Sequence, residues 1–148
     1  MITLRKGTKQ DLSELFELIK ELAIYEDGLD QISNTIERME EEGFGENSAF
    51  EFILAEDDSG IIGASIYYYR YSTWKGKRMY LEDLIVKEAK RGQGAGKLLF
   101  DETIKIGKER GCSGMMWQVL DWNEPAINFY KKYKTDFDET WINCNLEF

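Results

Sequence analysis

Residues 78–100 read RMYLEDLIVKEAKRGQGAGKLLF, and this stretch decides the fold. Its apolar run predicts a strand over residues 78–86, which leads into a loop where three glycines alternate with other residues. Helical spacing follows from Lys97 to Arg110, and Gly111 is a stop signal. Glycines let backbone N–H groups approach an anion closely, and a helix N-terminus adds about half a positive charge. The order of strand, loop and helix therefore predicts an anion site at residues 91–96.

Two common anion-binding loops do not fit this stretch. A Walker A loop ending at Lys97 needs glycine at position 91 and Ser or Thr at 98, where the chain has Arg91 and Leu98. A dinucleotide fingerprint fails as well, because it needs its third glycine where Lys97 or Leu99 stands. What remains is Arg-x-x-Gly-x-Gly without a magnesium-binding hydroxyl. This pattern predicts that the loop holds a pyrophosphate without a metal.

Alternating strand and helix signals cover the rest of the chain. Asn123 is a good helix cap, because Pro125 then lies in the first turn, where its missing N–H costs nothing. No repeat, low-complexity tract or linker interrupts the chain, so we predict one α+β domain over residues 1–148 around a mixed sheet. We expect strands at 2–7, 50–56, 61–71, 78–86, 114–120 and 140–148, and helices at 9–24, from Ser33 or Asn34 to about 43, at 97–110 and after Asn123.

Composition excludes several classes of protein. The 148 residues carry a net charge of −9 and include no histidine, which excludes Ser-His or Cys-His nucleophiles and histidine-bound metals. Cys112 and Cys144 lack metal-ligand spacing. The negative charge argues against a nucleic-acid partner and favours a cationic or neutral substrate. Because no apolar run approaches 18 residues and no leader-like segment follows Met1, we expect a cytoplasmic protein without a membrane partner.

The glycine loop resembles the acetyl-CoA signature of the GNAT acetyltransferase superfamily, since residues 91–96 match its RxxGxG pattern. The segments LIKELAIYE, YSTWKG, YLED and LDWNEPAINFY, with a late Trp141, are similar in order to the spermidine/spermine N-acetyltransferase branch, which includes thialysine acetyltransferases. The resemblance covers nearly the whole chain. It implies a central, mostly antiparallel twisted sheet flanked by helices, with splayed strands at the cofactor site. It also implies acetyl-CoA as the cofactor, no metal, and a homodimer.

The same resemblance implies which residues hold acetyl-CoA. The pantetheine arm lies between two splayed strands, here YLEDLIV and GMMWQVL, and pairs with the main chain of the first. Asn123 matches a family position that contacts the cofactor, which is compatible with capping a helix. The implied cofactor-binding residues are Leu84, Ile85, Val86, Arg91, Gly92, Gln93, Gly94, Ala95, Gly96, Lys97 and Asn123.

Glu82 matches the family position that is usually assigned as the general base. A primary ammonium has a pKa of ~10.4 and an unperturbed glutamate ~4.3, a mismatch of about six units or roughly 8 kcal/mol. We therefore favour Glu82 holding the ammonium and passing its proton through water, with a surface salt bridge as the alternative role. Asp83 points to the opposite face if the strand is regular, unless a bulge intervenes.

Tyr130 matches the general acid of the family. A phenol with a pKa of ~10 is protonated at neutral pH and can protonate a departing CoA thiolate. The alternative is a helix tyrosine that packs against the sheet. This arrangement implies direct attack in a ternary complex rather than an acetyl-cysteine route through Cys112.

The acceptor pocket of the branch combines aromatic faces with carboxylates, which suits an alkylammonium. Ser72 stands where polyamine-preferring members carry an acid, and YSTWKG is more similar to relatives that favour thialysine. We expect a diamine, polyamine or thialysine-like acceptor. Acetylation of a protein lysine or N-terminus, and CoA sensing without turnover, are the alternatives. The implied substrate-binding residues are Tyr25, Glu26, Trp74, Glu82 and Asp83.

Overall fold

A five-stranded sheet organises the first of two units in the computed structural model, which describes residues 1–148. The first unit spans Met1–Gln118 and the second Val119–Phe148. The single domain predicted over residues 1–148 remains a prediction.

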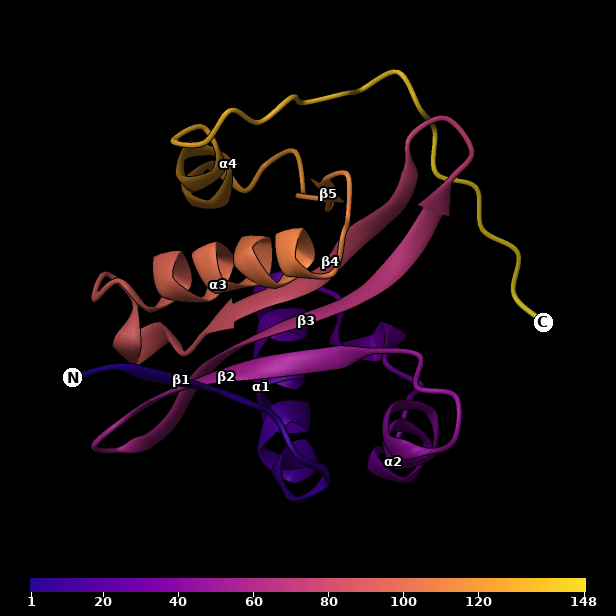
Figure 1. Ribbon diagram of the computed structural model, residues 1–148. Helices are drawn as coiled ribbons and strands as arrows, with labels where there is room; N and C mark the ends of the chain where they lie inside the picture. Colours follow the sequence, from indigo (N-terminus) through magenta and orange to yellow (C-terminus); the bar gives the residue numbers. More distant parts are fainter. The chain divides into compact units, whose positions relative to one another are not determined.

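The strands follow one another across the sheet in chain order (Figure 1). Neighbours pair antiparallel from the first strand to the fourth, whereas the fourth and fifth pair in parallel. The predicted mixed, mostly antiparallel sheet is therefore confirmed. The strands are β1 (Thr3–Lys6), β2 (Glu51–Asp57), β3 (Gly60–Ser72), β4 (Gly76–Val86) and β5 (Met115–Met116).

Helices of the first unit cover both faces of the sheet (Figure 1). Two lie on one face, α1 (Leu12–Tyr25) and α2 (Ile36–Phe44), and α3 (Ala95–Glu109) lies on the other. No helix in the structure is both long and apolar enough to cross a membrane. Short 3-10 turns are η1 (Lys9–Asp11), η2 (Leu29–Gln31) and η3 (Glu88–Lys90).

The apolar run in β2 has no polar alternation because both of its faces are covered. Phe52 and Leu54 pack in the cluster formed with α1 and α2. Ile53 and Ala55 point the other way and pack in the cluster formed with α3. Successive strand residues thus supply the two cores in turn.

The start of α2 differs by one or two residues from the prediction. Thr35 is the N-cap, and its hydroxyl accepts a hydrogen bond from the Arg38 N–H at 3.1 Å. Ser33 and Asn34 lie outside the helix, and the Asn34 side chain accepts from the Thr35 N–H at 2.9 Å. Several possible caps in a row leave the position undecided until the helix packs.

The strand predicted at residues 114–120 is much shorter in the structure. Only Met115 and Met116 pair with β4, opposite Met79 and Tyr80. The register of β4 shifts directly after this pairing, and a bulge bends and twists its strand. Parallel pairing therefore does not continue.

The second unit contains one helix, α4 (Glu124–Tyr130). The Asn123 side chain accepts a hydrogen bond from the Ala126 N–H at 3.3 Å, and Pro125 lies in the first turn. The predicted cap is therefore confirmed.

The strand predicted at residues 140–148 is wrong. No residue after α4 lies in a strand, and the apolar side chains of this segment are exposed. Trp141 is 73% exposed and Ile142 86%. Alternating polarity forms a strand only where a sheet edge pairs with it, and the segment pairs with no edge within this chain.

Candidate active site

The glycine loop between η3 and α3 uses backbone conformations that other residues rarely adopt. Gly92 has φ 79° and Gly94 has φ 90°, both in the left-handed region. Gly94 is the N-cap of α3, so no capping side chain covers the first helical amides. These N–H groups have no acceptor within the helix. The start of α3 therefore presents main-chain donors to an anion.

The last turns of α1 contact this loop. The Arg91 Nε donates to the Val86 carbonyl at 3.1 Å, and its guanidinium carbon lies 5.0 Å from the centroid of the Tyr25 ring. The Glu88 N–H donates to the Glu21 carboxylate at 3.0 Å. A hydrogen bond and a cation–ring contact therefore join the end of α1 to the loop segment.

Ion pairs occupy two lysines of the basic segment around the loop. The Lys90 Nζ lies 2.8 Å from the Asp57 carboxylate, and the Lys97 Nζ lies 2.5 Å from that of Asp101. Hydrogen bonding from Lys90 holds the pKa of Asp57 well below its usual range. An anion at the loop would therefore be held mainly by main-chain amides and by Arg91.

One edge of β4 is open beside the loop. The parallel partner β5 reaches only Met79 and Tyr80, so no strand pairs with the outer edge of Leu81–Val86. Unpaired strand edges carry free N–H and C=O groups that can bind an extended ligand. Leu84, Ile85 and Val86, predicted to pair with pantetheine, lie on this edge.

A β-bulge at Glu82 changes the geometry of the two adjacent carboxylates. Tyr67 pairs with Leu81 and Ile66 pairs with Asp83, so Glu82 has no partner in β3. Asp83 consequently lies on the face of Ile66, which packs with α1. Glu82 turns to the same side, because one of its oxygens accepts a hydrogen bond from the Tyr68 hydroxyl at 3.3 Å. The bulge that the sequence left open is present, and both carboxylates share one face.

Burial and like charge dominate the electrostatics of this face. Burial, and after it the negative charges of Glu82 and Glu26, together raise the pKa of Asp83 to about 7. Burial also raises the pKa of Glu26. The pKa of Tyr68 is raised to about 12 by burial and by Glu82. The face therefore favours a bound cation or a bound proton.

Glu26 is held in place by the end of α1. It is the C-cap residue, and Asp27 follows in a left-handed conformation with φ 57°. The Asp27 N–H donates to the Ile24 carbonyl and the Gly28 N–H to that of Ala23, the two bonds of a Schellman motif. The backbone at Glu26 is thus fixed.

The structure separates Trp74 from the acidic face. Trp74 lies at the tip of the β3–β4 hairpin and is 83% exposed. The six residue-to-residue steps from Gly76 to Glu82 span about 20 Å of strand. The hairpin extends past the other strands (Figure 1), so one chain does not bring Trp74 to Glu82. Tyr25, in contrast, lies against the glycine loop through Arg91.

Two predicted site residues belong to the second unit. Asn123 caps α4, as its side-chain bond shows. Tyr130, the last residue of α4, is buried, and its ring lies edge-on to that of Phe129. The roles of Asn123 and Tyr130 toward a cofactor remain predictions.

The sequence did not identify Tyr68 and Tyr80 as site residues. Their rings stack at a centroid distance of 5.1 Å, and Tyr68 donates to Glu82. The two tyrosines face each other across β3 and β4. The register of the predicted hairpin could have indicated this pair, because residues at equal distances from the turn lie opposite each other.

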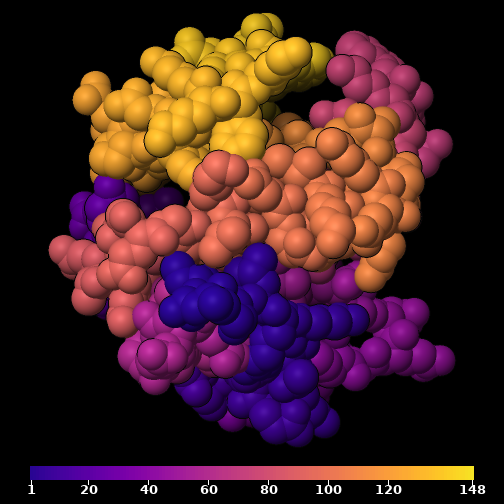
Figure 2. Space-filling model, turned by 60° about the vertical axis from the view of Figure 1, so that its left-hand side comes forward, coloured from indigo at the N-terminus to yellow at the C-terminus, as the bar shows by residue number.

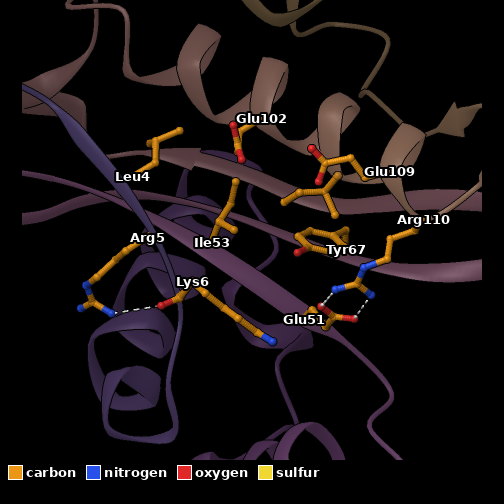
Figure 3. A pocket seen from close by; sticks show the side chains of 10 residues that line it. Leu4, Arg5, Lys6, Glu51, Ile53, Tyr67, Glu102, Glu109 and Arg110 are labelled. Carbon is orange, nitrogen blue, oxygen red and sulfur yellow. Dashed lines mark hydrogen bonds and ion pairs between the residues drawn. The ribbon is translucent and has the colours of Figure 1, made fainter.

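Two clefts lie elsewhere on the first unit. The one in Figure 3, of about 210 Å³, lies between α3 and strands β1, β2 and β3, and Arg110 pairs with Glu51 at one end. Figure 2 shows β1 in indigo beside α3 in salmon and orange. The other, of about 290 Å³, lies near residues 48–51 and Tyr68. Neither is lined by Glu82, Asp83 or the glycine loop, so neither cleft coincides with the predicted site.

Comparisons with known proteins agree with this geometry. Residues 12–134 match the family model described as Acetyltransferase (GNAT) family. The thialysine N-epsilon-acetyltransferase of Sus scrofa is 36% identical over 88% of this chain and 81% of its own length. That of Mus musculus is 35% identical over 97% of this chain and 91% of its own length. An aminoglycoside acetyltransferase structure from an uncultured soil metagenomic sample covers 99% of this chain and 96% of its own, with a TM-score of 0.80 and 19% identity, which shows the fold alone.

Proposed function

This chain belongs to the GNAT acetyltransferase family and is an N-acetyltransferase, and we propose that it transfers the acetyl group of acetyl-CoA to a primary amine of a small cationic acceptor. The observation that carries the proposal is the pair of left-handed glycines at the N-terminus of α3, directly after the open edge of β4. Members of the family generally use acetyl-CoA.

The residues at the loop and strand edge fit this cofactor. Main-chain amides at residues 92–97 would hold its diphosphate, helped by Arg91. The free edge at Leu84–Val86 would pair with the amides of pantetheine. No group of acidic or cysteine side chains is arranged to hold a metal ion, and an anion site built from backbone donors requires none. When bound, acetyl-CoA supplies the acetyl group as a thioester.

The acidic face supports a cationic acceptor. Glu26, Glu82 and Asp83 share it, and the stacked rings of Tyr68 and Tyr80 lie beside Glu82. Carboxylates and aromatic faces both attract an alkylammonium. Carboxylates would hold the amine while its proton is removed, and the Tyr130 hydroxyl would protonate the leaving thiolate.

A short acceptor fits better than a long polyamine. Ser72 is neutral, and its hydroxyl accepts from the N–H groups of Trp74 and Lys75 at 3.2 and 3.1 Å, which holds the hairpin turn together. It therefore adds no negative contact for a second ammonium. Similar relatives are thialysine N-epsilon-acetyltransferases, and we propose thialysine or a lysine-like amine as the acceptor class.

We propose that the enzyme acts as a homodimer. Trp74 is exposed at a hairpin tip about 20 Å from Glu82 of its own chain. A second copy could bring its own Trp74 to this site. The exposed apolar residues after α4 are a further surface that association would cover.

Thiol release from acetyl-CoA tests the proposed activity. Thialysine, spermidine, putrescine and a lysine peptide are each supplied to the enzyme. We expect release with thialysine at the highest kcat/KM. A preference for the lysine peptide would favour protein acetylation instead. No release with any amine, together with CoA binding, would favour a sensor and refute the proposal.

Gly94→Asp should abolish cofactor binding. Aspartate strains the left-handed position and places a negative charge where the diphosphate would lie. Calorimetric titration with CoA measures the loss. Asp30→Asn, on η2, is the control and should bind like the wild type. Retained affinity in Gly94→Asp would place the diphosphate elsewhere.

Tyr130→Phe should lower kcat about 100-fold with little change in CoA affinity, since it removes one proton donor. Stopped-flow thiol release and calorimetry separate the two quantities. A variant with full kcat would remove Tyr130 from the mechanism.

A further inference from the structure

The bulge in β4 gives its two adjacent carboxylates different surroundings. Glu82 is exposed, and one of its oxygens is engaged by the Tyr68 hydroxyl. Asp83 is half-buried and lies on the α1 face. We propose that Asp83, rather than Glu82, accepts the proton of the acceptor amine, and that Glu82 and Glu26 orient the ammonium. The inference rests on the proposed function and names the group that performs its first step.

Acidic groups surround Asp83 from each neighbouring element. Glu82 is adjacent in β4, and Glu26 comes from the end of α1. Burial raises the pKa of Tyr80, and the charges of Glu82 and Asp83 also raise it, whereas that of Arg70 lowers it. The charge of Arg70 in β3 partly offsets the rise in the pKa of Tyr68 and Tyr80. The only charges that act on Asp83 are those of Glu82 and Glu26. An arriving ammonium would be the first positive charge at this carboxylate.

The polarity of α1 strengthens this effect. Its C-terminal carbonyls carry about half a negative charge, and negative side chains are unfavourable there. Yet Glu26 and Asp27 close the helix, and its last turn has no basic residue. The negative end of α1 thus adds to the potential that attracts an ammonium and holds a proton on a neighbouring carboxylate.

These surroundings suit a proton acceptor near neutral pH. The pKa of Asp83 is about 7, so its difference from an ammonium at ~10.4 is about three units, compared with about six for an unperturbed glutamate. Transfer is most effective when the acceptor pKa lies near the working pH. Asp83 would take a proton from the ammonium, and the freed nitrogen lone pair would form the new N–C bond as the C–S bond breaks. Tyr130 would give its proton to the sulfur, and the second proton that the nitrogen loses on becoming an amide would restore the Tyr130 hydroxyl. Asp83 would then return its proton to water.

The pH dependence of kcat/KM with the preferred amine separates Asp83 from Glu82. For the wild type we expect a fall of tenfold per pH unit below about 7, because Asp83 must be ionised, and a plateau above it. In Asp83→Asn, kcat/KM at pH 8 should be about 100-fold lower than in the wild type, and the fall of kcat/KM below pH 7, the acid limb of the profile, should disappear. Glu82→Gln should keep the limb and move it to lower pH, since one negative neighbour of Asp83 is gone. Asp30→Asn serves as the control.

The reverse pattern would overturn the inference. If Glu82→Gln removes the limb and Asp83→Asn keeps it, Glu82 is the acceptor. A second readout needs no turnover: carboxyl ¹³C resonances should show Asp83 titrating near 7, assigned by its absence in Asp83→Asn. A titration midpoint near 4 for Asp83 in an active enzyme would refute its role as proton acceptor but leave the proposed function standing. No turnover of any amine by the wild type would sink the proposed function, and this role with it.

Discussion

The two ends of helix α1 hold carboxylates in opposite surroundings. At the N-terminal end, Asp11 accepts hydrogen bonds from both terminal nitrogens of Arg5 at 2.7 and 2.8 Å. It also accepts from the N–H and hydroxyl of Thr8 at 2.8 and 2.9 Å, and its pKa is held well below the usual range. At the other end, Asp83 lies with Glu26 and Glu82, and its pKa is raised.

This difference separates a stabilising carboxylate from the one that we propose to be functional. Asp11 lies at the positive end of the helix and opposite a cation, so its charge stabilises the fold. Asp83 lies near the negative end among like charges, so its charge opposes folding. A half-buried acid in such surroundings is a candidate functional group, which agrees with the role that we propose for Asp83.

Asp11→Ala should have the largest effect on stability, a loss of about 3 kcal/mol, because it removes four hydrogen bonds, two of them from a cation. The folded pKa of Asp11 is lowered, so its contribution is present above the unfolded value of ~3.8 and is lost as pH falls through that range. Urea unfolding at pH 7 and pH 3 measures both. The deficit of the variant should shrink at pH 3.

Activity per folded molecule of Asp11→Ala should equal that of the wild type, since its site is at the other end of α1. A loss of stability below about 0.5 kcal/mol, the usual range for surface changes, would contradict the stabilising role.

Asp83→Asn should act in the opposite direction and stabilise the protein by about 2 kcal/mol at pH 8. The folded pKa of Asp83 is raised to about 7, so wild-type stability is fullest below ~3.8 and falls as pH rises through 7. The asparagine lacks this decline. Unfolding midpoints of the two proteins should therefore lie close together at pH 3.5, differ by pH 5 and differ most at pH 8. Equal stabilities at pH 8 would mean that Asp83 is ionised at little cost.

Asp27→Gly should have the smallest effect, a gain of about 1 kcal/mol, because glycine accepts the left-handed conformation at the end of α1 without strain. Thermal unfolding measures the gain. The matched change at the other glycine motif, Gly94→Ala, should cost a similar amount. A destabilised Asp27→Gly would show that the aspartate side chain, rather than the backbone, ends the helix.

Local signals in the sequence predicted most of the fold. The alternating glycines indicated a turn that needs glycine, which the structure forms at Gly92 and Gly94. Asn123 followed by Pro125 predicted the start of α4. These features depend on the backbone preferences of a few adjacent residues, which a sequence carries in full.

Features that depend on how distant segments pair or pack could not be predicted from these local signals. The bulge at Glu82 arises from the register between β3 and β4, and it decides on which face Asp83 lies. The alternation at residues 140–148 is typical of a strand, yet the segment pairs with no edge of this chain. The raised pKa of Asp83 requires the end of α1, which is 57 residues away from it at Glu26 (83 − 26). The sequence shows that such groups are present but does not show that they lie close together in the fold.

Amide chemical shifts on adding CoA test the central claim most directly. In a ¹⁵N-labelled enzyme we expect the largest changes at residues 92–97 and at Leu84–Val86, with Thr8 and Asp11 at the far end of α1 unmoved. Shifts confined to other elements, with residues 92–97 unchanged at saturation, would contradict the assignment of the glycine loop as the diphosphate site.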